Sequence, residues 1–420
     1  MITVDRRSIL IRFAAARTGI IALIAVSVLV GSAVPSAAIV SEKDILGDLP
    51  VGSVSEETTR IAPDVGMEAG ILVASNGRVL WAREPDQERA MASTTKIMTA
   101  VVAFEQGTLD ELVTVSSRAA GIGESAARLR AGESYPLSTL LEAILVRSGN
   151  DASIAIAEHI AGSVEKFAEL MNAKAVELGL EHTHFANPHG LDAEDHYTSA
   201  ADLATLARYA MGKPEFRRMA GLESTVVPNT DGPGELENSN LLITTLEGAT
   251  GVKTGWTGRA GYCLVASAER EGMELFAVVL GTDDEMQRFQ QAGLLLEWGF
   301  FHYTEQRLAE SGESVESIEV ADYLDASLEV VVEKPVAVRV FEPAGPVQRV
   351  ISLPETIEAP VTARERIGTL SFIQGERLVA QVALVAAEEV RRPSLPERLW
   401  ISIVRAWRSV FGEPVPVPVM

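Results

Sequence analysis

The chain of 420 residues contains a single cysteine, Cys263, so it cannot form an intrachain disulfide. Cys263 lies in the apolar stretch from Tyr262 to Ala268, where one free cysteine is typical of a small core residue. Positive charge is also scarce, because 36 Lys and Arg stand against 58 Asp and Glu and give a formal net charge of -22. Such an acidic chain repels phosphate backbones, so we expect no nucleic-acid partner, and the acidity favours solubility.

A long apolar run is missing as well. The run from Gly19 to Val30 is shorter than the ~20 residues of a spanning helix. Four arginines precede it within residues 1–17, and the small residues Ser36, Ala37 and Ala38 follow it. This order is typical of a secretory signal. We predict a signal peptide over 1–38, with an uncleaved anchor as the alternative, and a polar, acidic linker over 39–60.

The body of the chain has two differently patterned regions. Residues 61–303 alternate between strand and helix patterns, and predict two β-hairpins (69–74 with 79–81, and 262–268 with 274–280) and helices around 137–145 and 294–298. Helices around an antiparallel sheet are the economical arrangement. Residues 304–392 show strict alternation interrupted by Pro and Gly, which predicts a small all-β domain.

The candidate chemistry begins with Ser93 and Lys96, at the start of a predicted helix that ends at Gly107. A spacing of three residues places the hydroxyl beside the amine on a helix. A serine hydroxyl becomes a useful nucleophile when a neighbouring base removes its proton, and a lysine is such a base when burial or a second cation lowers its pKa. Alone, this pair is common on exposed helix faces.

Two more short motifs follow in order. Ser148 and Asn150 flank Gly149 just after a predicted helix, where a hydroxyl could relay a proton and an amide could hold a substrate carbonyl. Lys253, Thr254 and Gly255 begin a predicted strand, where Lys and Thr could bind a carboxylate and Gly would let substrate lie close. Each motif alone is weak evidence for an active site, but the three motifs in this order, behind an export signal, are strong evidence.

The trio resembles that of penicillin-binding proteins and class A β-lactamases. Four stretches are closest to the low-molecular-mass penicillin-binding proteins that act as serine D-Ala-D-Ala carboxypeptidases: 92–99 (ASTTKIMT), 187–191 (NPHGL), 253–257 (KTGWT) and 295–300 (LLEWGF). The resemblance implies an α/β (α+β) transpeptidase/β-lactamase-like domain over 61–303, a β-sandwich domain over 304–392, and a C-terminal membrane anchor. It also implies an enzyme that removes the terminal D-alanine from peptidoglycan pentapeptides through an acyl-enzyme and that β-lactams inhibit covalently.

The resemblance also implies a role for each site residue. Ser93 would be the nucleophile, Lys96 its general base and Ser148 a proton shuttle. Substrate would be bound by Asn150, Lys253, Thr254, Gly255, Trp256 and Arg288, with the backbone N–H groups of Ser93 and Trp256 as the oxyanion hole. Met91 stands where the family often has proline, and the acidic linker has no counterpart that we can interpret.

Other functions remain open at this point. A β-lactamase would share Ser93 and Lys96 but needs a base for fast deacylation, which we do not find among the motifs. A D,D-endopeptidase would use the same site on cross-links. Four histidines fall within residues 182–196, but no Asp or Cys pattern completes a metal site, so we expect no metal and no cofactor.

The C-terminal segment over 393–420 contains the membrane signal. Leu399, Trp400, Ile403, Val404, Trp407, Val410 and Phe411 follow helical spacing on one predicted face, and Arg398, Arg405 and Arg408 lie on the other. Pro396 precedes this predicted amphipathic helix and Gly412 ends it. Such a helix is typical of an interfacial anchor, with docking on the protein itself as the alternative. We therefore expect a peripheral protein at the outer face of the cytoplasmic membrane.

Overall fold

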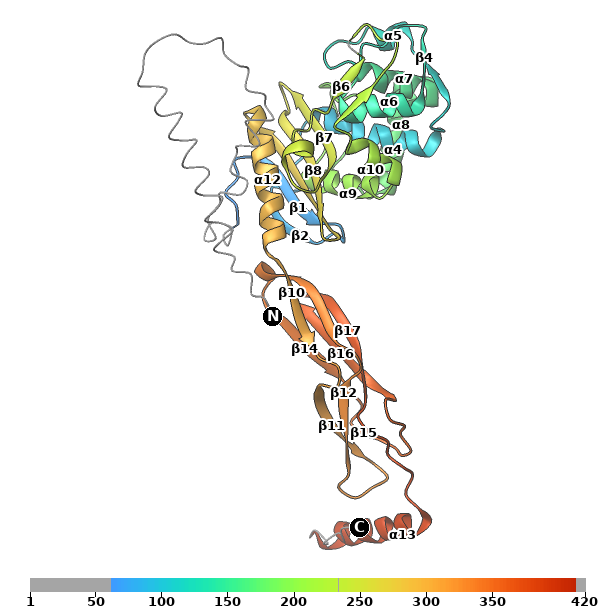
Figure 1. The fold of residues 1–420 in the computed structure, drawn as a ribbon, viewed down its shortest axis with the longest axis vertical. Coiled ribbons are helices and arrows are strands. Elements are labelled where there is room, and N and C mark those ends of the chain that lie inside the picture. The colour runs from blue at the N-terminus through green and yellow to red at the C-terminus, as the bar shows by residue number, and fades with distance from the viewer. Residues whose placement is uncertain (1–61, 233, 413–420) are drawn as a thin grey trace, which may run out of the picture. The chain divides into compact units, whose positions relative to one another are not determined.

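The computed structural model describes residues 62–412 except residue 233. The predicted signal peptide and linker, and the last eight residues, lie outside the described residues. The chain divides into two compact units between Phe300 and Phe301. Figure 1 shows both units.

The first unit is built on a five-stranded antiparallel sheet with the strand order β2-β1-β9-β8-β7. Its strands are β1 (Ala69–Ala74), β2 (Val79–Arg83), β7 (Ala249–Thr257), β8 (Gly261–Arg270) and β9 (Met273–Thr282). Both predicted hairpins are present, β1 with β2 and β8 with β9. The Lys253 motif lies in the middle of β7 rather than at its start, because the strand already begins at Ala249.

The central strands are apolar on both faces because helices cover both. Alternate residues such as Ile71, Val265 and Val278 belong to the main core. Their neighbours point to the other face, where Leu72 and Leu275 would collide with a side chain at Gly299 of α12 (Glu285–Phe301). Figure 1 shows α12 on one side of the sheet and α4, α9 and α10 on the other.

The helical side of the unit holds the motifs at helix ends. Its elements are η1 (Ala92–Thr95), α4 (Lys96–Gln106), α5 (Ser117–Ala120), α6 (Leu137–Val146), α7 (Asn150–Ala161), α8 (Val164–Glu177), α9 (Ala200–Met211), α10 (Pro214–Ala220) and α11 (Leu242–Thr245). Two short hairpins complete it, β3 (Leu112–Thr114) with β4 (Ser134–Pro136) and β5 (Ser224–Val226) with β6 (Glu235–Glu237). Ser199 caps α9, since its Oγ accepts a hydrogen bond from Asp202 N at 3.1 Å.

The second unit is the predicted all-β domain followed by a helix. A six-stranded sheet has the order β14-β16-β17-β12-β11-β15, and β10 pairs with β13. The strands are β10 (Tyr303–Ala309), β11 (Ser314–Val320), β12 (Ser327–Val332), β13 (Val336–Phe341), β14 (Val347–Ser352), β15 (Thr356–Ile357), β16 (Arg366–Gln374) and β17 (Arg377–Ala386), with the 3₁₀ helix η2 (Glu342–Ala344) after β13. Inward residues such as Val330, Phe372 and Leu384 form its core.

The unit ends in α13 (Leu395–Phe411), which begins with a capping box between Ser394 and Glu397. Pro396 therefore lies in the first turn of the helix and does not precede it, a position that proline tolerates because no intrahelical donor is needed there. Gly412 ends the helix at φ 67°, as predicted. In the described part of the chain, no helix has the length and apolar character needed to cross a membrane.

Candidate active site

Ser93 lies in a strained turn at the N-terminal end of α4. The preceding Ala92 adopts φ 48°, and η1 turns the chain into α4 so that Lys96 follows one turn later. Lys96 Nζ lies 2.9 Å from Ser93 Oγ, within hydrogen-bond distance. The predicted pair is therefore formed, although Ser93 belongs to a 3₁₀ turn and the α-helix begins at Lys96.

Lys96 is fully buried, and its amine contacts three oxygen atoms. Besides Ser93 Oγ, it donates to Asn150 Oδ1 at 2.8 Å and to the backbone carbonyl of His189 at 2.5 Å. Burial lowers the pKa of Lys96 well below its usual value, and the charge of Lys253 lowers it further. A lysine with a lowered pKa can accept a proton from a neighbouring hydroxyl such as that of Ser93.

Ser148 and Asn150 come to the same site from the α6–α7 junction. Ser148 adopts φ 67° and is buried, and its hydroxyl has no hydrogen-bond partner among the described residues. The Asn150 amide bridges Lys96 and the carbonyl of Gly123, to which its Nδ2 donates at 3.3 Å. In this state Asn150 holds the lysine, a contact that the sequence did not predict.

The other side of the site is β7, the edge strand of the sheet. Lys253 is buried, and its Nζ donates to the backbone oxygen of Thr254 at 3.2 Å. Burial and the Arg288 charge lower the pKa of Lys253 to about 7. Gly255 packs against the Ser93 turn so closely that a Cβ there would lie 3.0 Å from Ser93 N. A glycine therefore allows β7 to pass this close to Ser93 without displacing the turn.

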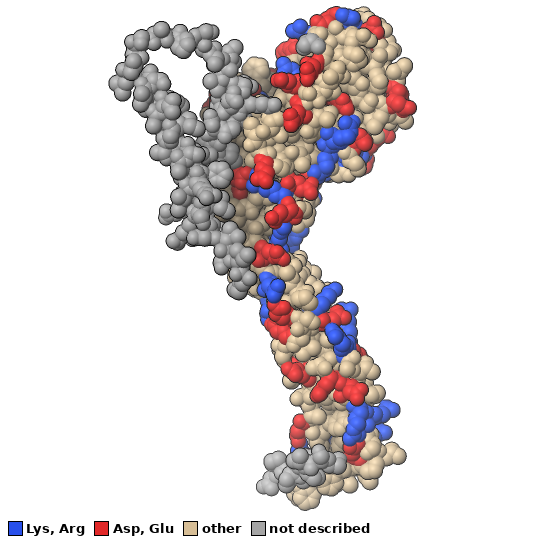
Figure 2. Space-filling model, in the orientation of Figure 1, with Lys and Arg blue, Asp and Glu red and all other residues tan. Residues whose placement is uncertain are grey.

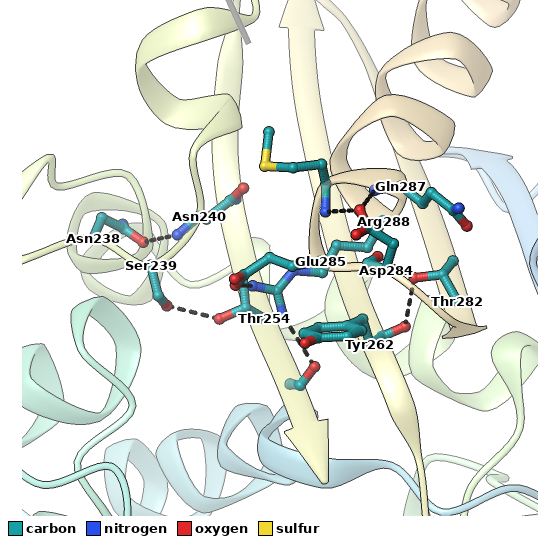
Figure 3. Close-up of polar contacts among 12 residues, drawn as sticks. Asn238, Ser239, Asn240, Thr254, Tyr262, Thr282, Asp284, Glu285, Gln287 and Arg288 are labelled. Atoms are coloured by element: carbon teal, nitrogen blue, oxygen red, sulfur yellow. Dashed lines mark hydrogen bonds and ion pairs between the residues drawn. The ribbon is translucent and has the colours of Figure 1, made fainter. Parts of the chain in front are cut away.

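These residues line one cleft of about 540 Å³ in the first unit. From the predicted set, Ser93, Ser148, Asn150, Thr254, Gly255, Trp256 and Arg288 line it, and the two lysines lie buried beneath Ser93 and Thr254. Glu124, Ser125, Arg147, Leu191, Ser239, Tyr262 and Glu285 complete the lining. Figure 3 shows Ser239 and Thr254 facing each other, and their hydroxyl oxygens lie 2.7 Å apart.

Arg288 reaches the cleft from the first turn of α12. Its Nη1 donates to the backbone oxygen of Gly255 at 3.2 Å, and its guanidinium lies 5.3 Å from the centre of the Tyr262 ring. Figure 3 shows Arg288 and Glu285 beside Tyr262. Cys263, one residue along β8, is fully buried, and burial raises the pKa of its thiol to about 11, as suits a core residue.

The histidine-rich segment supports the site from behind. His196 accepts a hydrogen bond from Ala186 N at its Nδ1, so its Nε2 carries the proton and faces Thr95 Oγ1 at 2.9 Å. Asn187 Oδ1 accepts from Gly190 N at 2.7 Å and shapes the turn whose His189 carbonyl contacts Lys96. The described residues contain no group of His, Cys, Asp and Glu suited to a metal ion.

Asp151 is a further residue that the sequence analysis missed. Its carboxylate accepts from the backbone N–H groups of Ala127 and Leu129 at 2.9 and 3.0 Å. It thereby fixes the loop that supplies Glu124 and Ser125 to the cleft. An aspartate directly after a candidate motif residue was the only available signal.

Comparison with known proteins decides the family. A family profile described as D-alanyl-D-alanine carboxypeptidase matches residues 56–284, and one described as the C-terminal domain of penicillin-binding protein 5 matches residues 303–392. The chain belongs to the D-alanyl-D-alanine carboxypeptidase family. It is a low-molecular-mass penicillin-binding protein and a serine-type D-Ala-D-Ala carboxypeptidase.

Individual relatives agree with this assignment. The enzyme is 34% identical over 332 residues to D-alanyl-D-alanine carboxypeptidase DacF of Bacillus subtilis, covering 77% of this chain and 85% of that protein. It is 30% identical to DacC of Escherichia coli, covering 86% and 94%. Penicillin binding protein 6B from Escherichia coli is a solved relative, with 30% identity, a TM-score of 0.60, and coverage of 77% of this chain and 96% of that one.

Proposed function

We propose that Ser93 is the acyl-ester nucleophile of the carboxypeptidase reaction and that neutral Lys96 is its base. The observation that carries the proposal is the 2.9 Å contact between Lys96 Nζ and Ser93 Oγ. Burial lowers the pKa of this lysine well below its usual value, which favours the neutral amine. Because the amine is already aimed at the hydroxyl, no rearrangement is needed before proton transfer.

The reaction proceeds in two halves. Lys96 takes the Ser93 proton as Oγ attacks the carbonyl carbon of the penultimate D-alanine, and the backbone N–H groups of Ser93 and Trp256 stabilise the oxyanion. The C–N bond then breaks, the departing amine receives a proton through the Ser148 hydroxyl, and D-alanine leaves. Water hydrolyses the resulting ester and restores Ser93. The unpartnered, buried hydroxyl of Ser148 supports the relay, since it has a hydrogen bond left to give.

Lys253, Thr254 and Arg288 form the receptor for the terminal carboxylate, and Gly255 allows the peptide to approach β7. The charges of Lys253 and Arg288 support this assignment, because Arg288 itself lowers the pKa of Lys253 and an incoming anion would relieve that repulsion. In this proposal Asn150 orients Lys96 in the resting enzyme and binds a substrate amide when the peptide enters.

The nucleophile is tested by replacing Ser93 with alanine. Ser93→Ala should lose covalent labelling by a fluorescent penicillin and lose D-alanine release from a pentapeptide, while its melting temperature stays close to that of the wild type. Ser117→Ala, which removes an exposed hydroxyl on α5, is the matched control and should label normally. Stoichiometric labelling of the Ser93→Ala enzyme would assign the nucleophile elsewhere.

We also propose that the enzyme is exported and is held at the outer face of the cytoplasmic membrane by α13. The exposed apolar side chains of Leu399, Trp400, Ile403, Trp407, Val410 and Phe411 support this, because six such residues on one helix are unusual for a surface in contact with water. In Figure 2 the part of α13 that grey atoms leave visible is mostly free of charged side chains. The basic and apolar start of the sequence supports export.

A further inference from the structure

Glu285 forms an ion pair with Arg288, the arginine that lines the cleft. Its Oε1 lies 2.5 Å from Arg288 Nη2, and both side chains line the cavity that contains Ser93. The two residues are one turn apart on α12, so their side chains share one face of the helix. Figure 3 shows the pair beside Tyr262, with Thr254 on the neighbouring strand.

Arg288 is held in place by contacts other than Glu285. Its side chain is only 6% exposed, Nη1 donates to the Gly255 carbonyl, and the guanidinium lies 4.6 Å from the centre of the Phe289 ring as well as against Tyr262. A guanidinium fixed in this way does not depend on Glu285 for its orientation.

Glu285, by contrast, has a side chain that is 45% exposed to solvent. We propose that Glu285 is a specificity-determining residue that competes with the terminal carboxylate of the substrate for the Arg288 guanidinium. The inference rests on the proposed role of Arg288 in carboxylate recognition. In the resting cleft Glu285 neutralises Arg288, and a substrate carboxylate must displace it or bind beside a like charge.

The competition has a defined electrostatic signature. Removing the Glu285 charge should favour every ligand that brings a carboxylate to this end of the cleft, and should leave ligands without one unaffected. Since the Glu285 side chain is nearly half exposed to solvent, the gain should be modest, about two- to fivefold. Salt screens exposed charges, so the gain should shrink as ionic strength rises.

The test compares Glu285→Gln and Glu285→Ala with the wild type. The probes are a penicillin, a peptide ending in D-Ala-D-Ala, and the same peptide ending in D-alaninamide. We expect the second-order acylation constant for the penicillin and kcat/KM for the acid peptide to rise two- to fivefold at low salt, with the amide peptide unchanged. Glu169→Gln, which removes the same charge from an exposed position on α8, should change neither constant.

Three results would overturn the proposal. The first is no change in either rate constant, and the second is a gain of equal size on the amide peptide. The third is a loss of activity that is larger for Glu285→Ala than for Glu285→Gln, which would mean that Glu285 positions Arg288. Arg288→Gln separates this inference from the carboxylate receptor. If Arg288→Gln leaves the acid peptide unaffected, the receptor role of Arg288 fails; if it impairs that peptide while Glu285→Gln changes nothing, only the role of Glu285 fails. In the double variant the gain from Glu285→Gln should disappear.

Discussion

Lys96 and Lys253 belong to one site, and burial lowers the pKa of both, although the proposed mechanism gives them different roles. Each is almost fully buried, and burial is the largest cause of the lowered pKa of both. In the proposed mechanism Lys96 must be neutral to accept a proton from Ser93, so a low pKa favours that role. Lys253 must be charged to bind an anion in the same proposal, and its pKa near 7 leaves that charge only partly present at neutral pH.

The pH dependence of acylation follows from these two directions. As pH falls through the lowered pKa of Lys96, the amine becomes protonated and the base is lost. As pH rises through about 7, unliganded Lys253 loses its charge and carboxylate recognition weakens. We therefore expect kcat/KM, which reports the free enzyme, to fall on both sides of a maximum.

Lys253 can be tested by substitution. Lys253→Ala should lower acylation by penicillin and turnover of D-Ala-D-Ala peptides by on the order of 2–5 kcal/mol of transition-state stabilisation, the loss typical of a desolvated charge contact. Lys253→Arg keeps its charge at alkaline pH, so whatever activity it retains should lack the decline above about 7. Unchanged acylation kinetics in Lys253→Ala would make Lys253 a structural residue of β7.

At the scale of elements, the segment from His182 to His196 packs against the turn that contains Ser93 and the start of α4. Gly190 adopts φ 90°, and a Cβ there would lie 2.0 Å from the carbonyl oxygen of Ala92. Thr99 on α4 donates to the Pro188 carbonyl at 2.6 Å. The segment and the Ser93 turn thus fix each other, and the buried His196 is part of this contact.

The neutral state of His196 makes this contact sensitive to acid. Burial lowers the pKa of His196 from 6.5 to about 4, so the unfolded chain binds the proton first as pH falls. His196 therefore contributes stability that is fully present above pH 6.5 and is lost as pH falls to about 4, on the order of 3 kcal/mol in all. The melting temperature of His196→Gln should fall less between pH 7 and pH 4 than that of the wild type. Parallel curves would contradict the assignment.

The sequence predicted those parts of the site that short motifs and periodicity encode. Ser93, Lys96 and the hairpins follow from local spacing, and the structure has them where expected. The contacts of His189 and His196 with the Ser93 turn and the contact of Glu285 with Arg288 could not be predicted in this way. They depend on which backbone carbonyl or side chain lies next to the motif in the folded chain. In the sequence, a Glu three residues before Arg288 is indistinguishable from one half of an ordinary ion pair on a helix surface. Only the structure shows that both side chains line the cleft.

The same limit applies to the C-terminal helix. Helical spacing predicted one apolar and one basic face, but Val404 and Ile401 are buried, while Arg408 pairs with Asp325 and Arg405 donates to the carbonyls of Ala321 and Tyr323. The loop between β11 and β12 thus engages two of the three arginines of the predicted basic face. The period of a helix gives its faces but not which of them the protein itself covers.

At the scale of the whole molecule, attachment to a membrane must overcome the charge of the chain. A net charge of -22 repels anionic lipid, and Figure 2 shows acidic and basic side chains interspersed over the visible surface of the second unit. With Arg405 and Arg408 committed to the protein, attraction to lipid headgroups is reduced. In the proposed anchoring, apolar burial of the exposed side of α13 is then the main source of affinity for the membrane.

A triple serine variant of α13 distinguishes a membrane anchor from a helix that packs on the second unit. Replacing Trp400, Ile403 and Trp407 together with serine removes exposed apolar area, and it leaves the buried Ile401 and Val404 in place. This triple variant should lose co-sedimentation with vesicles containing anionic lipid, and it should keep its melting temperature and penicillin labelling.

A control that replaces the exposed Val176 and Leu112 of the first unit with serine should sediment like the wild type. Because the affinity is mainly apolar, raising the salt concentration should weaken wild-type binding only slightly. If the triple variant and the wild type sediment alike, the exposed side of α13 is not the anchor; if the variant melts earlier, these side chains belong to the packing of the second unit.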